Sequence, residues 1–461
     1  MRIAAIATLL AASVVTTVLS LVLLPFNATR VVEPLVWFTA ALWALFAASV
    51  FMLRRVPTRA AIVLVMVGAV AIGGASLAGP PNTSTDSARY AWDGIVQRAG
   101  ISPYEYAPAD PALSALRTDW LSPPPVDGEC VGQRIMTFEE PGTGNVLCSA
   151  INRLTVPTIY APTAELYFAA TRLIAGPDAT YLPSQVGGLL LSLAVTALLL
   201  RTLLRLGRDP RWAAMWAWCP LVATEAITNS HVDALSALLL LLATALVGSK
   251  RQWLGGLALG AATAVKLIPA IGGAAILRWR VVVGAVVAFA VLYVPYVLLS
   301  GIDVLGFLPG YLGEEGYGSG KRFILFTLFA PGPVATILAA LVIVATVALV
   351  VWKSDPANPW LGQVVLIGVV LLVLSPRYAW YALLLVPMIA MSGRWEWLAV
   401  PLALTERLLV KDPTIGRISI FLSIVFIVAI SVRRMTPEAR KHWDPRRLTR
   451  RFVPRLGAKN R

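Results

Sequence analysis

The stretch GPPNTSTDSARYAWDGIVQRAGISPYEYAP (residues 79–108) follows an uncharged apolar run and opens the only long polar segment before the C-terminal tail. Within it, Asp86, Arg89, Tyr90 and Asp93 are spaced so that a helix would place the four side chains on one face. Two carboxylates, a guanidinium and a phenol would then gather where the chain leaves a membrane. We expect Asp86 to be a general base that deprotonates a hydroxyl group. The alternative is a solvated loop with an ordinary Asp–Arg pair.

The composition indicates a membrane protein. The chain is 58% hydrophobic and 14% charged, whereas about 25% of the residues of soluble proteins are charged. Uncharged runs long enough to span a bilayer as helices recur along the chain. The predicted fold is an all-α polytopic membrane protein with about 12–14 segments. The expected segments are 3–24, 34–53, 60–78, 185–204, 212–228, 231–248, 253–265, 267–277, 281–299, 333–352, 360–376, 378–392, 395–410 and 415–432.

Basic residues predict the topology. Arginines and lysines cluster after alternate spans. The positive-inside rule places these clusters, and both termini, in the cytoplasm. The expected location is the plasma (inner) membrane. Residues 1–24 lack a cleavage site and are expected to remain as the first helix. The expected divisions are N-terminal helices (1–78), a large extracytoplasmic loop (79–184), a transmembrane bundle (185–432) with an outer loop at 300–322, and a basic cytoplasmic tail (433–461).

Two segments fit this topology less simply. Residues 158–174 are amphiphilic and carry Glu165 and Arg172, so we expect an interfacial or re-entrant helix on the outer face. Residues 253–277 hold two apolar stretches that are short for spanning. They are compatible with a hairpin of half-length helices that turns at Lys266–Pro269.

The net charge of +15 does not indicate a nucleic-acid-binding protein. Eleven of the 39 basic residues lie within 433–461, next to the last span. A basic segment beside a span is more simply a cytoplasmic retention signal that contacts anionic lipid.

Two of the three cysteines lie in the large polar loop. If that loop is extracytoplasmic, it lies in an oxidising space, and a Cys130–Cys148 disulfide is plausible. The alternative is two free thiols. The third cysteine, Cys219, lies in an apolar segment.

Polar groups at the ends of spans are costly and mark candidate binding sites. His231 and Asp233 lie at an outer turn and could face the same cleft as the polar loop, or simply cap the next helix. Lys266, between two apolar half-helices, could neutralise a phosphate, or extend its ammonium to the interface.

A second outer turn adds cationic and aromatic candidates. Arg377 could bind phosphate in a bidentate manner, and Tyr378, Trp380 and Tyr381 could stack on a ligand ring or belong to an interfacial aromatic belt. Arg322 ends a glycine-rich outer loop and is a further candidate for a phosphate contact.

No cofactor is expected. One histidine and scattered acids in the candidate region lack any recognised metal-ligand spacing, so no metal is predicted, and a metal site stays the minor alternative. A phosphate-binding Gly-x-x-x-x-Gly-Lys loop and a soluble nucleotide-sugar domain are also missing from the sequence, so a donor substrate is expected to arrive through the lipid phase.

Together these residues resemble the GT-C superfamily of polyprenyl-phosphate-sugar-dependent glycosyltransferases, in particular the actinobacterial branch of α-1,2-mannosyltransferases and arabinofuranosyltransferases. The resemblance rests on Asp86-x-x-x-Tyr90, Gly100-Ile101-Ser102-Pro103-Tyr104, Tyr160–Glu165, His231-x-Asp233, Lys266-x-x-Pro269, and Ser375–Tyr378 with Trp380, Tyr381 and Pro387.

The resemblance implies a GT-C-like bundle and an extracytoplasmic site at which an aspartate of the first long outer loop acts as base. It implies transfer of a sugar, with mannose as the first candidate in this branch, from a polyprenyl monophosphate donor to a glycolipid or glycan of the cell envelope, with inversion at the anomeric carbon. Members of the superfamily often show adjacent acidic residues in this loop. Here Asp86 and Asp93 are separated, which leaves open which of them is the base.

Two other classes of function compete with this prediction. A transporter or flippase of a lipid-linked saccharide would need charged residues near the membrane centre, whereas the candidates here cluster at the outer ends of spans. A scaffold protein of the envelope would tolerate replacement of Asp86 and of the outer arginines.

Overall fold

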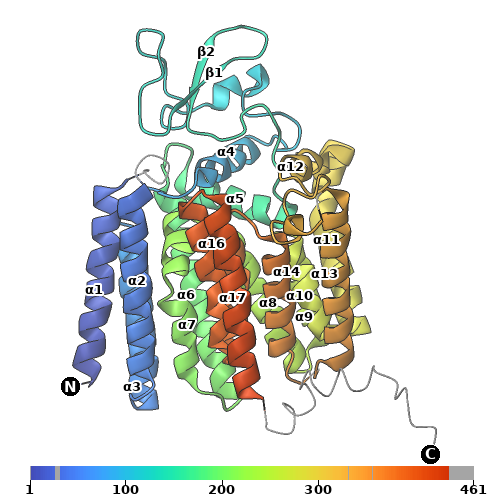
Figure 1. Ribbon diagram of the computed structural model, residues 1–461. Helices are drawn as coiled ribbons and strands as arrows, with labels where there is room; N and C mark the ends of the chain where they lie inside the picture. Colours follow the sequence, from blue (N-terminus) through green and yellow to red (C-terminus); the bar gives the residue numbers. More distant parts are fainter. Residues whose placement is uncertain (1, 26–31, 331, 356, 436–461) are drawn as a thin grey trace, which may run out of the picture.

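The computed structural model describes residues 2–25, 32–330, 332–355 and 357–435. Upright helices form a bundle, and the segment between α3 and α6 lies over one end of it (Figure 1). The first described helix, α1, begins at the opposite end of the bundle, and the last described helix, α17, ends there. The first and last described helices thus have these ends on one side of the bundle, and the cytoplasmic placement of the termini stays a prediction. The predicted basic tail lies outside the described residues from 436 onward.

Seven helices of the described chain are long and apolar enough to cross a membrane, which confirms the prediction of an all-α polytopic membrane protein. These helices are α1 (Arg2–Leu23), α2 (Val32–Leu53), α3 (Thr58–Ala75), α6 (Leu182–Arg205), α11 (Trp279–Ser300), α13 (Pro333–Lys353) and α17 (Pro413–Arg434). An eighth is formed if a π-helix at Val222–Thr228 and α8 (Asp233–Gly248), which are bent by 109° at their junction, count as one broken span.

The remaining predicted segments are shorter helices. They are α7 (Ala214–Ala217), α9 (Gln252–Thr263), α10 (Ile268–Gly273), α14 (Trp360–Leu374), α15 (Val386–Ser392) and α16 (Ala399–Leu409), with α12 (Leu308–Glu314) in the loop after α11. Prolines explain several of the breaks, because a helix cannot continue unchanged through a residue that lacks an N–H. Pro269 lies in the first turn of α10 and Pro387 in the first turn of α15. The ambiguous segment 253–277 is thus two short helices separated near Lys266.

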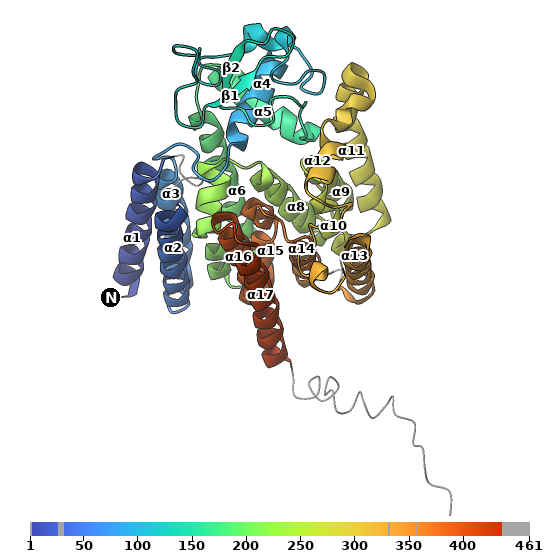
Figure 2. The same cartoon turned by 45° about the horizontal axis from the view of Figure 1, so that its top comes forward.

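The polar segment between α3 and α6 folds into a separate layer, which we call the roof (Figure 2). It contains α4 (Asp86–Arg98), α5 (Pro162–Ala175) and a hairpin in which β1 (Met136–Glu139) pairs antiparallel with β2 (Val146–Ser149). The expected disulfide links Cys148 of β2 to Cys130, which precedes β1.

The two roof helices approach each other closely at Gly94 of α4. A Cβ atom at this position would lie 2.4 Å from the carbonyl oxygen of Phe168 in α5, so only glycine allows the contact. The ambiguous segment 158–174 therefore forms a roof helix packed on α4, and both of its charged residues, Glu165 and Arg172, are buried.

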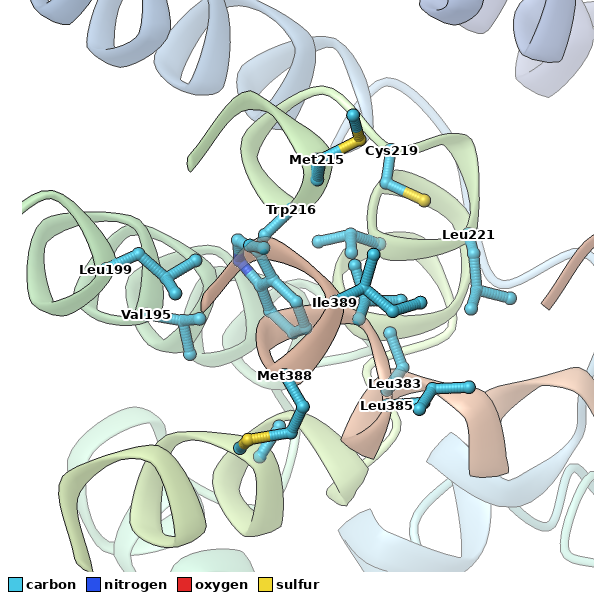
Figure 3. Close-up of a cluster of buried hydrophobic side chains, with 14 of the residues drawn as sticks. Val195, Leu199, Met215, Trp216, Cys219, Leu221, Leu383, Leu385, Met388 and Ile389 are labelled. Carbon is cyan, nitrogen blue, oxygen red and sulfur yellow. The ribbon is translucent and has the colours of Figure 1, made fainter. Parts of the chain in front are cut away.

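The bundle core is densely packed around Trp216 of α7 (Figure 3). The indole lies among Val195 and Leu199 of α6 and Met388 and Ile389 of α15, and its Nε1 atom donates to the carbonyl oxygen of Ser192 at 3.0 Å. Tight packing of this kind holds helices in place where lipid supplies little hydrophobic driving force. It fixes the chain just before the π-helix, which carries part of the candidate site.

Candidate active site

A cavity of about 740 Å³ lies between the roof and the bundle. Its volume falls in the range of about 300–1,000 Å³ that is typical of small-molecule sites. Six of the predicted site residues line it, and they are Asp86, Arg89, Lys266, Tyr378, Trp380 and Tyr381. Segments far apart in the sequence therefore meet around one space.

Asp86 is the first residue of α4 and has its side chain 21% exposed. Its backbone N–H donates to Oγ of Ser84 at 3.1 Å, and its Oδ1 atom accepts a hydrogen bond from Nδ2 of Asn152 at 2.8 Å. Burial raises the pKa of Asp86, while the bond from Asn152 and the charge of Lys266 oppose that rise. Of the three predicted aspartates, Asp86 is the one that lines the cavity.

Asp93 shares the buried face of α4 with Arg89 but lies behind the cavity. The Nε atom of Arg89 is 2.8 Å from Oδ1 of Asp93, and both side chains are almost fully buried. The Nη1 atom of Arg89 also donates to the carbonyl oxygens of Arg153 and Val156. Arg89 thus holds the roof together, while its Nη2 atom has no hydrogen-bond partner among the described residues.

Glu165 of α5 is a second carboxylate in this buried group, and the spacing of residues in the sequence did not indicate that it lies near Asp93. The hydroxyl of Thr158 lies 2.9 Å from Oδ2 of Asp93 and 2.7 Å from Oε1 of Glu165. One hydroxyl proton can serve only one of these oxygens. Burial and the negative charge of Asp93 raise the pKa of Glu165 well above its ordinary value, so the two carboxyl groups compete for the proton of the Thr158 hydroxyl.

His231 is buried directly behind the cavity wall. Its ring stacks on Trp380 with centroids 3.8 Å apart and planes 17° apart. Its Nδ1 atom is 3.1 Å from the hydroxyl of Tyr90 and 3.8 Å from Oδ2 of Asp86, and its Nε2 atom is 3.3 Å from Oε2 of Glu225. The structure therefore brings His231 and Tyr90 to Asp86, but neither lines the cavity.

The bundle side of the cavity carries a cation that is held in an ion pair. The Nζ atom of Lys266 lies 2.6 Å from Oδ2 of Asp233 and 4.6 Å from the centre of the Tyr381 ring. The Tyr381 hydroxyl in turn lies 2.9 Å from that of Tyr311. Asp233 thus contacts the cavity through Lys266, which is the predicted residue best placed to meet an anionic group there.

Arg322 and Arg377 do not line the cavity. The guanidinium of Arg322 is buried in an ion pair with Glu315, and its Nε atom donates to the carbonyl oxygen of Leu374 at 3.1 Å. The side chain of Arg377 is exposed. The structure separates both arginines from the group around Asp86.

Sequence patterns missed several residues of the site. Asn152 and Arg134 come from the irregular part of the roof, and Arg134 donates to the carbonyl oxygens of Asn82 and Ser84, just before α4. Glu225 lies in the predicted apolar span 212–228. An acidic residue within such a span was the one feature of the sequence that could have indicated a site there. Among the described residues, no three His, Cys, Asp or Glu side chains form a group that could hold a metal ion.

Comparison with known proteins connects this geometry to glycosyl transfer. The sequence model of glycosyltransferase family 87 matches residues 159–376. That range contains His231, Asp233, Lys266 and Arg322 but begins after Asp86. The match supports the predicted resemblance to GT-C glycosyltransferases.

One curated relative from Mycolicibacterium smegmatis is the polyprenol-phosphate-mannose-dependent alpha-(1-2)-phosphatidylinositol pentamannoside mannosyltransferase. It is 28% identical to this chain over 256 residues, which cover 47% of the chain and 60% of the relative. The chain thus matches less than two thirds of the relative's length. No solved structure matches the chain significantly.

Proposed function

We propose that this chain, which matches glycosyltransferase family 87 and resembles the GT-C mannosyltransferase branch, is a membrane glycosyltransferase. In this proposal it transfers a sugar, mannose first among the candidates, from a polyprenyl monophosphate to a glycolipid or glycan of the cell envelope on the extracytoplasmic side. The observation that carries the proposal is the pair formed by Asp86 and Lys266, which face one cavity from the roof and from the bundle.

The cavity suits a lipid-linked donor because much of its lining is apolar. The apolar lining includes Leu267 and Ile268, which directly follow Lys266 in the sequence, and Leu305, Leu308 and Leu312. A prenyl chain can remain in apolar surroundings there while its phosphate meets the Lys266 ammonium. Trp380 is stacked between His231 and Tyr378, so Tyr378, whose ring lies 4.6 Å from that of Trp380, offers its other face for a sugar ring.

The chemistry assigned to the residues follows from these positions. Asp86 removes the proton of the acceptor hydroxyl as that oxygen attacks the anomeric carbon. The bond between that carbon and the phosphate oxygen breaks, and its electron pair leaves with polyprenyl phosphate. Lys266 stabilises the charge that grows on the departing phosphate. Asn152 keeps the Asp86 carboxylate oriented through its 2.8 Å hydrogen bond.

A transfer assay tests the proposal. Purified protein in proteoliposomes is supplied with radiolabelled polyprenyl-phosphate mannose, or with the corresponding arabinose donor, and with glycolipids extracted from a strain that lacks the protein. The expected product is a glycolipid one sugar larger, identified by mass spectrometry, and EDTA is included in a parallel reaction. Movement of labelled lipid across the bilayer with no new glycosidic bond would instead identify a flippase.

A further inference from the structure

Arg153 of the roof lines the cavity that contains Asp86, and its side chain extends to Glu314 at the end of α12. We propose that the Arg153 guanidinium binds an anionic group, phosphate or carboxylate, on the acceptor, and that the Glu314 carboxylate occupies this position until the acceptor displaces it. The inference rests on the proposed function. It narrows the acceptor to an anionic glycolipid or glycan and makes Arg153 a residue that determines acceptor specificity.

The cavity lining carries more cations than carboxylates. Among the described residues, Asp86 is the one acidic side chain that lines it, whereas the basic side chains there are Arg89, Arg134, Arg153 and Lys266. A polyprenyl-phosphate sugar is a phosphodiester with a single negative charge, and Lys266 of the bundle is placed to meet that charge. The three arginines belong to the roof, so the roof side of the cavity is suited to a second anionic group.

The cations differ in how deeply their carboxylate partners are buried. Arg89 and Lys266 pair with aspartates whose side chains are 2% and 6% exposed. The Glu314 side chain is 51% exposed, and that of Arg153 is 32% exposed. Breaking a buried pair leaves a poorly solvated charge and is strongly unfavourable, whereas an exposed pair contributes little. Arg153 is therefore the cation that can exchange its carboxylate partner for a ligand.

Arg153 is held in place at both ends of its side chain. Its backbone has a positive φ of 53°, which is uncommon for a residue other than glycine, and its carbonyl oxygen accepts a hydrogen bond from Nη1 of Arg89 at 3.3 Å. Its guanidinium carbon lies 5.3 Å from the ring centres of both Phe307 and Tyr311. A guanidinium that is already oriented can grip an oxyanion with two parallel hydrogen bonds at a small cost in entropy.

The position of Arg153 in the chain connects it to the base. The preceding residue, Asn152, donates to Oδ1 of Asp86 at 2.8 Å. An acceptor whose anionic group is bound by Arg153 therefore has neighbouring hydroxyl groups within the part of the cavity that contains Asp86. Anion binding at Arg153 would thus orient the acceptor for attack.

A pair of tyrosines separates this proposed anion site from the cation that faces the donor. The Tyr311 hydroxyl lies 2.9 Å from that of Tyr381. The Arg153 guanidinium contacts the Tyr311 ring, and the Lys266 ammonium lies 4.6 Å from the centre of the Tyr381 ring. The two cations thus contact different rings, so the donor phosphate and the acceptor anion can bind at separate places.

Glu314 can release Arg153 without displacing α12. The next residue, Glu315, forms an ion pair with Arg322 in which the side chains are 6% and 2% exposed, respectively. This buried pair holds the end of α12 on the bundle. The exposed Glu314 carboxylate can therefore move into solvent while the helix stays in place.

Single variants of the exposed ion pair test the inference, because a ligand site and a structural tether predict different signs. Arg153→Gln should raise the KM of the acceptor about tenfold to hundredfold, since a charge-assisted hydrogen bond is lost. Glu314→Gln should lower it about twofold to fivefold, since a weak competitor is removed. The KM of the donor should not change in either variant. Acceptor KM values that move in the same direction, or that do not move, overturn the inference.

The charge of the acceptor is tested directly. Glycolipids from a strain that lacks the protein are separated by anion exchange into neutral and anionic fractions. Each fraction is supplied to the wild type with radiolabelled polyprenyl-phosphate mannose or the corresponding arabinose donor, and we expect labelled product from the anionic fraction alone. Labelling of the neutral fraction overturns the inference and leaves the proposed function intact. Labelling of neither fraction overturns the proposed function, and the inference with it.

Asp303→Asn is the matched control for the loss of charge in Glu314→Gln. Asp303 is an exposed acidic residue of the same outer loop and does not line the cavity. Its replacement should leave the KM of both substrates at the wild-type value. A decrease in acceptor KM equal to that of Glu314→Gln would show that the net charge of the loop, and not the contact with Arg153, is responsible, and would overturn the inference.

A ³¹P NMR titration with inorganic phosphate measures the site without catalysis. It is carried out in the Lys266→Met background, which removes the cation assigned to the donor. Adding Glu314→Gln should tighten phosphate binding about twofold to fivefold, and adding Arg153→Gln should abolish it. Arg153→Lys keeps the charge but not the bidentate geometry, so it should weaken binding even if the Gln variant fails to fold. Equal phosphate affinity in all these variants overturns the inference.

Discussion

The Nζ atom of Lys266 lies 2.6 Å from Oδ2 of Asp233, so the cation that faces the cavity is anchored from behind by a carboxylate. The anchor fixes the ammonium before any substrate enters, which reduces the reorganisation needed in the transition state. It also means that either residue leaves a poorly solvated charge when the other is removed.

Lys266→Met is therefore expected to lower kcat/KM for the donor by about 100-fold, because it removes a preorganised charge that meets the departing phosphate. The KM of the acceptor should change little. Steady-state assays with each substrate varied separately provide the measurement. The double variant Lys266→Met with Asp233→Asn is the control, since it removes both charges. If it transfers sugar normally, the cation has no part in the reaction.

Asp86→Asn and Asp93→Asn should fail in different ways. Asp86 lines the cavity, so its replacement should lower kcat by about 10² to 10⁴ with an unchanged melting temperature. Asp93 is paired with Arg89 at 2.8 Å away from the cavity, so its replacement should lower the melting temperature. Activity assays and scanning fluorimetry on both variants distinguish the roles. Full activity in Asp86→Asn with none in Asp93→Asn would reverse the assignment.

The pH dependence of transfer should reflect Asp86. A general base works ionised, and burial raises the pKa of this carboxyl above its ordinary value of 3.8. Activity is therefore full above that raised pKa and is lost as the pH falls through it. Asn152→Ala removes a hydrogen bond that lowers the pKa, so the acidic limb should move to higher pH while the high-pH plateau persists. Profiles of kcat/KM against pH for the two proteins test this, and superimposable limbs would contradict it.

Glu165 should influence stability through its proton. Its pKa is raised well above the ordinary 4.5, so the folded protein holds a proton that the unfolded chain releases. That contribution is complete below the ordinary pKa and is lost as the pH rises through the folded value. Glu165→Gln, which mimics the protonated form, should therefore equal or exceed the wild type in melting temperature at alkaline pH. Glu165→Ala is the contrast and should cost about 1–3 kcal/mol by leaving its buried partners unsatisfied. A Gln variant less stable than the wild type at high pH would show that the carboxyl is ionised.

The roof should depend on its disulfide. Cys130 and Cys148 are 18 residues apart, and closing a loop of this length stabilises a fold by about 3 kcal/mol in the chain-entropy model. Replacing both by Ser should lower the melting temperature and also kcat, because Arg134 from the same loop holds the segment that leads into Asp86. Cys219→Ala, at the buried free cysteine of the bundle, should have neither effect and should leave sensitivity to reductant intact.

Local patterns in the sequence predicted those features that depend on neighbouring residues. The spacing from Asp86 to Asp93 placed four side chains on one face of α4, and Lys266–Pro269 marked the break between α9 and α10. The composition predicted the membrane class. The lengths of the helices were predicted less well, because an apolar stretch that forms a short helix, such as the 12-residue α9, cannot be told from part of a membrane span by composition.

Contacts between distant segments lay beyond such patterns. Arg377 has the charge expected of a phosphate ligand, but its side chain is exposed. It lies two residues after Ser375, where a left-handed backbone conformation ends α14. Glu225 faces His231 because of a π-helix, and no residue pattern predicts that conformation. Asn152 approaches Asp86 only through the folding of an irregular loop.

The order of the segments along the chain has a consequence for biosynthesis. Asp86 is synthesised with the roof, whereas Lys266 follows α6, α8 and α9 in the sequence. The two residues can line one cavity only after the helices before and after the roof have been inserted into the bilayer. A ribosome-bound or wrongly inserted chain thus has no assembled centre. The order of the helices therefore delays assembly of the site until insertion of the segments that carry Asp86 and Lys266 is complete.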